Sequence, residues 1–156
     1  MSYLASLPGL LCGLALSAED VHSRRVPRKW VAVGAMAQLA ASLAYAIVFN
    51  DLFSLLASVL FALLSALAQA AMAIIRPSAL GFGDVTATLV IGLSVGLWGL
   101  TVTALWWVIM GLFGVSWIVW WSHCDPQRHG AHAGRVPYVP VIAIAGIIAV
   151  AIGPLL

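Results

Sequence analysis

Long apolar runs, broken by short stretches of charged or turn-forming residues, most constrain what this chain can fold into. Of its 156 residues, 63% are hydrophobic and only 8% are charged. A soluble protein of this length needs far more charge on its surface and cannot bury so much apolar area in its core. Most side chains must therefore face lipid. We predict a helical membrane protein, because helices satisfy their backbone hydrogen bonds internally.

Six apolar runs follow one another along the chain. About 20 residues cross the roughly 30 Å hydrocarbon layer of a bilayer. The fourth run, with about 14 residues, covers only ~21 Å at a rise of 1.5 Å per residue. Either the bilayer is thin there, or the segment 79–83 before it dips below the surface. The runs cover residues 3–18, 30–49, 52–75, 84–97, 100–121 and 138–156. We predict one all-α domain over residues 1–156, a polytopic membrane protein with six transmembrane helices and a short fourth helix.

The positive charges predict the orientation in the membrane. All 7 Lys and Arg residues fall in the first, third and fifth breaks between the runs, which lie on one side of a six-helix protein. Cytoplasmic loops carry the excess of Lys and Arg, so this side is predicted to be cytoplasmic and both termini outside. These residues are Arg24, Arg25, Arg28, Lys29, Arg76, Arg128 and Arg135.

Other features exclude several classes of protein. The first run lacks the positive residues that precede the apolar core of a signal peptide, since the first basic residue is Arg24. We therefore expect it to stay as a membrane helix. The two cysteines, Cys12 and Cys124, are too few and too badly placed for a disulfide framework or a four-thiolate zinc site. The net charge of +2 gives no indication of nucleic-acid binding.

Two acidic motifs lie at the predicted cytoplasmic ends of helices. Gly81-Phe82-Gly83-Asp84 opens the fourth run, and by itself it is a weak signal, because an Asp in the first turn of a helix is a common cap. Asp20 ends the first run and is followed by Val26-Pro27. Ionisable residues inside membranes are costly and usually functional. The predicted topology brings Asp20 and Asp84 to the same depth, which is the geometric condition for a catalytic pair.

Together the motifs resemble those of the type IV prepilin peptidases, members of the Gly-x-Gly-Asp class of intramembrane aspartyl proteases. That family has an Asp, five residues and then Ile/Val-Pro after its first helix, and Gly-x-Gly-Asp before its fourth. A third similarity is Pro137-Tyr138-Val139-Pro140 before the last run. The resemblance covers nearly the whole chain, including the number of helices.

The resemblance implies an aspartyl endopeptidase that cleaves leader peptides from prepilin or pseudopilin precursors at the cytoplasmic membrane face. Two close carboxylates that share one proton supply both the base and the acid for peptide hydrolysis. It implies no metal and no cofactor, and as partners only the precursors and the lipid bilayer of the inner membrane; the oligomeric state stays open. The catalytic pair would be Asp20 and Asp84, with substrate-approach or backbone roles for Gly81, Phe82, Gly83, Val26, Pro27, Pro137 and Pro140.

The chain departs from the family pattern in two ways. Arg28 follows the Val-Pro pair, where Asn is frequent in the family. Many bacterial members also carry an insert with two Cys-x-x-Cys pairs and methylate the new N-terminus of the pilin. This chain resembles the compact form that serves tight-adherence (Flp) pili, and no N-methyltransferase activity is expected.

Other polar residues and other functions compete with this interpretation. Glu19 adjoins Asp20 but points about 100° away on a helix, so a catalytic role is disfavoured. Asp51 is interpreted as a solvated residue and Asp125 as a turn residue before Pro126. An interfacial position is favoured for His22 over a role in tuning the charge near Asp20. A transporter or channel with an acidic proton relay and a non-catalytic scaffold for pilus assembly remain as alternative functions. The loop 122–135, which holds His123, Cys124, Asp125, His129 and His132, matches no strong zinc signature, and Gly92-x-x-x-Gly96 is interpreted as a helix-packing motif.

Overall fold

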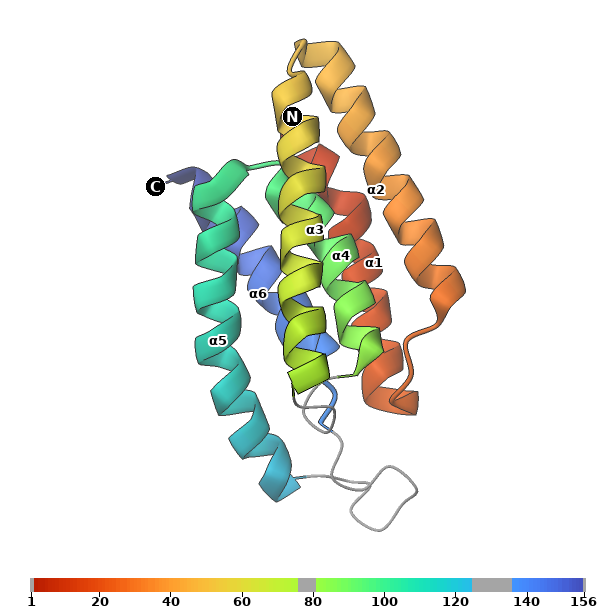
Figure 1. Cartoon of the computed structure of the whole chain (residues 1–156), viewed down its shortest axis with the longest axis vertical. Helices are drawn as coiled ribbons and strands as arrows, with labels where there is room; N and C mark the ends of the chain where they lie inside the picture. Colours follow the sequence, from red (N-terminus) through yellow and green to blue (C-terminus); the bar gives the residue numbers. More distant parts are fainter. Residues whose placement is uncertain (1, 76–80, 125–135, 156) are drawn as a thin grey trace.

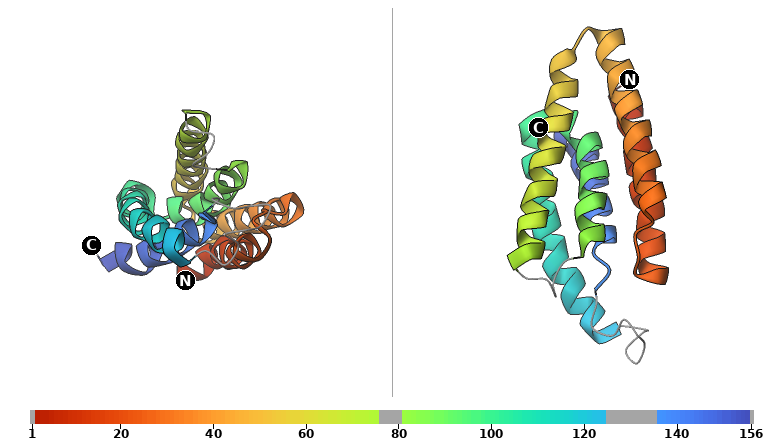
Figure 2. Two further views of the ribbon diagram at one scale, coloured as in Figure 1. Left: turned by 90° about the horizontal axis from the view of Figure 1, so that it is seen from below. Right: turned by 45° about the vertical axis from the view of Figure 1, so that its right-hand side comes forward.

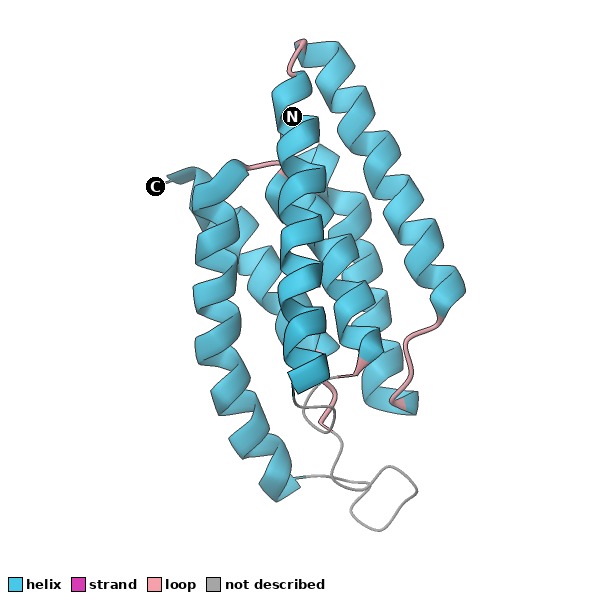
Figure 3. Ribbon diagram, in the orientation of Figure 1, coloured by secondary structure: helices cyan, strands magenta, loops and turns pink. Residues whose placement is uncertain are grey.

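The computed structural model describes residues 2–75, 81–124 and 136–155, and this part of the chain is helical throughout, without a strand (Figures 1 and 3). The predicted all-α fold, with six helices and a short fourth helix, is confirmed. The helices are α1 (Ser2–Ser23), α2 (Arg28–Phe49), α3 (Leu52–Ile75), α4 (Phe82–Gly96), α5 (Gly99–Cys124) and α6 (Val139–Ile152), followed by the 3-10 turn η1 (Gly153–Leu155). The predicted dip at 79–83 falls partly outside the described residues.

Four of these helices, α1, α2, α3 and α5, are long and apolar enough to cross a membrane. The other two are shorter, with 15 residues in α4 and 14 in α6. The last helix is thus shorter than the predicted span of 138–156. It ends at Ile152 because Pro154 has no N–H to continue the helical hydrogen bonds, and the chain tightens into η1. At the other end of the chain, α1 extends beyond Asp20 to Ser23, since no Gly or Pro interrupts it before Pro27.

Helix α4 lies at the centre of the bundle and packs against all five other helices (Figure 2). From Val90 to Gly96 each of its residues is buried. The outer helices show the reverse pattern, because large apolar side chains of α2, α3 and α5 are exposed around the bundle. An apolar exterior around a central helix is what a protein solvated by lipid requires.

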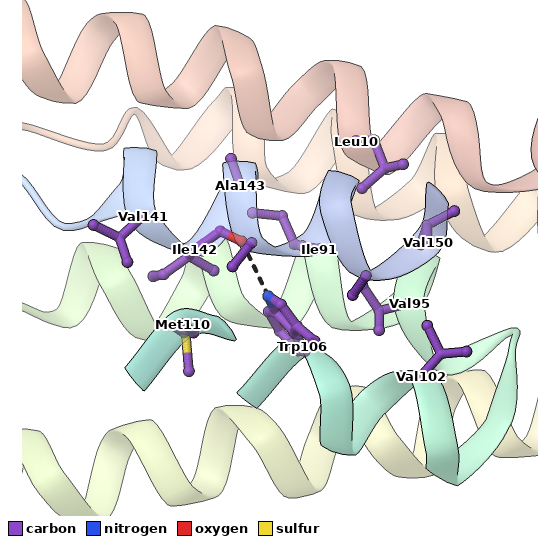
Figure 4. Packing of buried hydrophobic residues seen from close by; sticks show 12 residues of the cluster. Leu10, Ile91, Val95, Val102, Trp106, Met110, Val141, Ile142, Ala143 and Val150 are labelled. Carbon is purple, nitrogen blue, oxygen red and sulfur yellow. Dashed lines mark hydrogen bonds between the residues drawn. The ribbon is translucent and has the colours of Figure 1, made fainter. Parts of the chain in front are cut away.

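The main apolar core joins α4, α5 and α6, with Leu10 added from α1 (Figure 4). Trp106 of α5 is its largest fully buried side chain, and the indole Nε1–H donates a hydrogen bond of 3.0 Å to the carbonyl oxygen of Ile142. A buried indole needs such a partner. This bond fixes the height of the short helix α6 against the long helix α5.

A polar network ties α1, α2 and α4 together at the end of the bundle where the chain begins. The Gln38 side chain is fully buried; its Oε1 accepts from the Gly9 N–H at 2.8 Å and from the Ser94 hydroxyl at 3.0 Å. Its Nε2 donates to the Ala5 carbonyl at 2.8 Å. Hydrogen bonds between helices partly replace the hydrophobic driving force that is missing in lipid.

The interpretation of Gly92 and Gly96 as a packing motif is confirmed. A Cβ atom at Gly92 would lie 2.9 Å from Cα of Ala62, and one at Gly96 would lie 2.9 Å from Cα of Ser58. Both neighbours are backbone atoms of α3, which cannot rotate away. The two glycines therefore allow α3 and α4 to approach at backbone distance.

We expect Gly92→Val and Gly96→Val each to lower the free energy of unfolding by about 1–3 kcal/mol, because overpacking separates α3 from α4. The measurement is thermal or denaturant unfolding of the purified protein in detergent. Gly111→Val in α5 is the matched control, since a Cβ there has nothing within 4 Å. Equal effects of all three substitutions would contradict the packing role.

Candidate active site

Asp20 lies in the last turn of α1 and faces the beginning of α6. Its carboxylate is only 7% exposed, and Oδ2 accepts a hydrogen bond of 3.3 Å from the Val139 N–H. Val139 is the first residue of α6, so this carboxylate occupies the N-terminal end of a helix. Free N–H groups and the helix dipole favour a negative charge at that position.

Asp84 lies in the first turn of α4 and is 8% exposed. Its Oδ2 accepts a hydrogen bond of 2.8 Å from the Gly81 N–H, and its own N–H donates to the Gly81 carbonyl at 3.0 Å. Asp84 therefore caps α4 from the third helical position, like the acid of a capping box. The same bond holds the carboxylate at the edge of the bundle.

The fold brings the two acids together. α1 ends, and α4 and α6 begin, at the end of the bundle away from both termini (Figure 1). The Asp20 and Asp84 carboxylates interact electrostatically, although 64 positions separate them in the sequence (84 minus 20). Two buried acids that interact in this way cannot easily both carry a charge.

Val26 and Gly83 connect the two acidic motifs directly. A Cβ atom at Gly83 would lie 2.6 Å from Cγ2 and 3.1 Å from Cβ of Val26. The absent side chain thus makes room for Val26, which packs on the backbone next to Asp84. At Gly81, by contrast, a Cβ would find its nearest atom, Oδ2 of Asp84, at 3.6 Å, which is ordinary contact.

A small apolar cluster forms the floor beneath the acids. Leu16 lies one turn before Asp20 on α1, and Ala87 lies one turn after Asp84 on α4. Both pack with Val139 into a buried cluster, against which Cys12, Val26 and Val31 also pack. The carboxylates therefore have an apolar layer on the side of the bundle interior, and such a layer strengthens electrostatic interactions.

The remaining predicted site residues surround this floor. Pro27 forms the N-cap of α2, with its carbonyl accepting from the Trp30 N–H at 3.0 Å. Pro137 is buried, and its carbonyl accepts a 2.8 Å hydrogen bond from the Trp117 indole. Pro140 is buried in the first turn of α6. Phe82 differs from them all, because its side chain is 74% exposed.

The other acidic side chains that the structure describes are hydrogen-bonded within their own helix or lie at the opposite end of the bundle. The Glu19 Oε1 accepts a hydrogen bond of 2.7 Å from the Ser23 hydroxyl of its own helix. Asp51 lies in the turn between α2 and α3 at the opposite end, where its carboxylate caps α3 through the Ser54 N–H at 3.1 Å. The hydrogen bond from the Ser54 hydroxyl lowers the pKa of the Asp51 carboxyl most, and the one from the Ser54 N–H lowers it further. Asp125 lies outside the described residues.

The histidine-rich loop gives no metal site in the part of the chain that can be described. His123 and Cys124 are exposed at the end of α5, and His123 Nδ1 lies 2.8 Å from the Val119 carbonyl oxygen. Asp125, His129 and His132 fall in the segment 125–135, which is outside the described residues. Within residues 2–75, 81–124 and 136–155, no three His, Cys, Asp or Glu side chains gather as metal ligands do.

Arg24 is the residue near the acids that the sequence did not single out. The sequence indicates only a charge in a basic loop. In the structure its side chain is buried, and it interacts electrostatically with Asp20 one helical turn earlier. The i, i+4 spacing of an acid and a base was the available signal, but on exposed helices such pairs are common and weak.

We expect Gly83→Ala to lower the midpoint of thermal unfolding more than Gly81→Ala, because only the first substitution clashes with Val26. The double variant Gly83→Ala/Val26→Ala loses the 2.6 Å contact with Cγ2 and keeps only the 3.1 Å contact with Cβ. The clash is therefore eased, and a coupling free energy of about 0.5–3 kcal/mol should appear in a double-mutant cycle. Unfolding in detergent measures all four proteins. Strictly additive effects would show that the two residues do not contact.

Comparison with known protein families gives one match. The model of the type IV leader peptidase family matches residues 7–116, a range that contains Asp20, Val26-Pro27 and the Gly81–Asp84 motif. Searches of curated proteins and of solved structures returned no significant match. The matched range is well over half of the 156 residues. The chain therefore belongs to the type IV leader peptidase family.

Proposed function

We propose that this peptidase is an intramembrane aspartyl endopeptidase that removes leader peptides from prepilin or pseudopilin precursors at the cytoplasmic face of the membrane. Membership of the family supports leader-peptide cleavage in general. The observation that carries the aspartyl mechanism is the pair of buried, electrostatically interacting carboxylates of Asp20 and Asp84. They come from two helices and meet at one end of the bundle.

The reaction follows from one proton shared by two carboxyl groups. The ionised carboxylate takes a proton from water, and the resulting hydroxide bonds to the scissile carbonyl carbon. The protonated carboxyl gives its proton to the carbonyl oxygen. Collapse of the tetrahedral intermediate breaks the C–N bond, and a proton passes to the leaving amine. The apolar floor of Leu16, Ala87 and Val139 limits the water that reaches the pair.

Substrate would approach along the exposed edge of α4. Gly81 and Phe82 are both exposed beside Asp84, so an extended leader can lie against backbone there. Gly83 and Val26 would hold this edge in place by their close contact. Pro27, Pro137 and Pro140 would fix the chain at the starts of α2 and α6. The precursor's own apolar helix would remain in the lipid.

We further propose that residues 1–156 form one catalytic membrane domain with both termini outside. The four positive residues from the end of α1 to the first turn of α2, Arg24, Arg25, Arg28 and Lys29, lie at the same end as the acids. Methylation of the processed pilin is not part of this proposal. The sequence holds 2 cysteines, which cannot form the two Cys-x-x-Cys pairs associated with that activity in the family.

We expect Asp20→Asn and Asp84→Asn each to abolish leader removal, with a loss of at least about 10³-fold, because neither amide can exchange the shared proton. The assay is co-expression with a prepilin, followed by the shift in size of the pilin. Glu19→Gln and Asp51→Asn are matched controls of the same chemistry and should cleave normally.

Full cleavage by either variant of the pair would end the aspartyl mechanism. Ion flux into liposomes that depends on Asp84, without cleavage, would favour a transporter instead. Normal pilus formation by both variants would favour a non-catalytic scaffold.

The orientation has its own test in intact cells. Cys124 is exposed at the end of the bundle that holds the acids, whereas Asn50 lies in the turn at the other end. A membrane-impermeant thiol reagent added outside should therefore label Asn50→Cys/Cys124→Ser and should not label the unsubstituted protein until the cells are opened. The reverse result would place the acids at the outer face.

A further inference from the structure

We propose that Arg24 is a positioning residue that keeps the negative charge of the acid pair on Asp20, so that Asp84 holds the shared proton. This inference rests on the proposed aspartyl mechanism and deepens it. It assigns Asp20 as the base that activates water and Asp84 as the acid that protonates the scissile carbonyl. The sequence motifs treat the two acids alike, and the assignment comes from what surrounds each of them.

The position of Arg24 is set by the end of α1. Its N–H donates a 2.9 Å hydrogen bond to the Asp20 carbonyl, which continues the helical pattern by one residue. Its backbone then turns into the left-handed region, with φ of 52°. A residue with a Cβ adopts this conformation only at a cost in free energy. The turn directs the Arg24 side chain back into the bundle, where it is 9% exposed.

A tryptophan of another helix holds the guanidinium in place. Cζ of Arg24 lies 5.5 Å from the centre of the Trp121 ring, which is within the range of a cation–π interaction. Trp121 is itself buried near the end of α5. The neighbouring Arg25 has the same charge but is exposed. Burial and stacking therefore distinguish Arg24 from a residue that only adds positive charge to a loop.

The two acids differ in the charge next to them. Both carboxylates lie at a helix start, where Asp20 accepts from the Val139 N–H at 3.3 Å and Asp84 accepts from the Gly81 N–H at 2.8 Å. Asp20 also has the Arg24 cation one turn away, whereas the charge that acts on Asp84 is that of Asp20. A nearby cation favours the ionised form of a carboxyl group, and a nearby anion disfavours it.

The end of α5 supports both of the partners that face Asp20. Trp121 stacks on Arg24, and Trp117 donates its indole N–H to the Pro137 carbonyl just before α6 begins. The rings of Trp117 and Trp121 are themselves stacked, with centroids 5.6 Å apart. The aromatic end of α5 therefore contacts both Arg24 and the segment before α6, the two partners of the Asp20 carboxylate.

Other ionisable groups belong to the elements that meet at this end of the bundle. Those in the described part of the chain, from every element that meets at this end, are Glu19, His22, Arg24 and Arg25 near the end of α1, Arg28 and Lys29 of α2, Asp84 of α4, His123 and Cys124 of α5, and Tyr138 before α6. Of these, Arg24 is the buried cation.

The test is the pH dependence of kcat/KM for a purified precursor peptide in detergent, with Arg24→Met and Arg24→Gln as neutral variants. Without the cation, Asp20 needs a higher pH to ionise, so the acidic limb of the profile should move up by about 1 pH unit. At pH values below the midpoint of this limb, we expect kcat to fall about tenfold relative to the unsubstituted enzyme, with KM nearly unchanged. Arg24→Lys keeps the charge and should return the limb most of the way to its original pH.

Arg25→Met is the matched control, because it removes an equal charge from the adjacent exposed residue. If Arg24→Met and Arg25→Met give the same profile, the effect is one of general charge and the proposal is overturned. A uniform loss of kcat at every pH, with a lower unfolding midpoint and no movement of the limb, would show a purely structural role and would also overturn it.

Three other variants keep the outcome decisive. Should both neutral Arg24 variants fail to fold, Trp121→Leu removes the ring that holds the guanidinium and should move the same limb in the same direction; an unmoved limb overturns the proposal. Asp20→Asn and Asp84→Asn are run beside them. Activity in those two variants would contradict the aspartyl mechanism itself. An enzyme that needs both aspartates, but whose acidic limb does not move in the Arg24 variants, would contradict only the role of Arg24.

Discussion

The structure depends on keeping two carboxylates buried at the end of a bundle that is otherwise solvated by lipid. A buried charge needs hydrogen bonds or an opposite charge, or it takes up a proton. Each acid obtains an N–H from the start of a short helical segment, Asp84 from Gly81 and Asp20 from Val139. Both carboxylates therefore lie beside the start of a helix, α6 for Asp20 and α4 for Asp84.

The packing of α4 carries this constraint through the bundle. Because α4 contacts every other helix, its position decides where Asp84 stands relative to Asp20. Gly92 and Gly96 set its distance from α3, and Gly83 accommodates Val26 from the segment after α1. Small residues thus do in lipid what large apolar side chains do in a soluble core, since close backbone contact replaces hydrophobic burial as the source of affinity.

Two chemically identical acids have different surroundings. The Trp-rich end of α5 contacts both Arg24 and the carbonyl of Pro137, which precedes the helix start that faces Asp20. Proteases that use paired carboxylates need one ionised and one protonated group, and an asymmetric environment selects which is which. In the proposed mechanism this asymmetry comes from Arg24 and from α5, an element that contributes no acid to the site.

The sequence by itself determined the helices and the family. Apolar runs bounded by Pro, Asn and charged residues predict helices well, because lipid admits few other structures. The paired motifs at Asp20 and Asp84 could be recognised in the sequence because carboxylates are rare in such apolar runs. Only the tertiary structure decided that Gly83 makes room for Val26 and that Arg24 turns inward onto Trp121. These are contacts between segments distant in sequence, or turns whose direction depends on a neighbour, and no local pattern of residues encodes them.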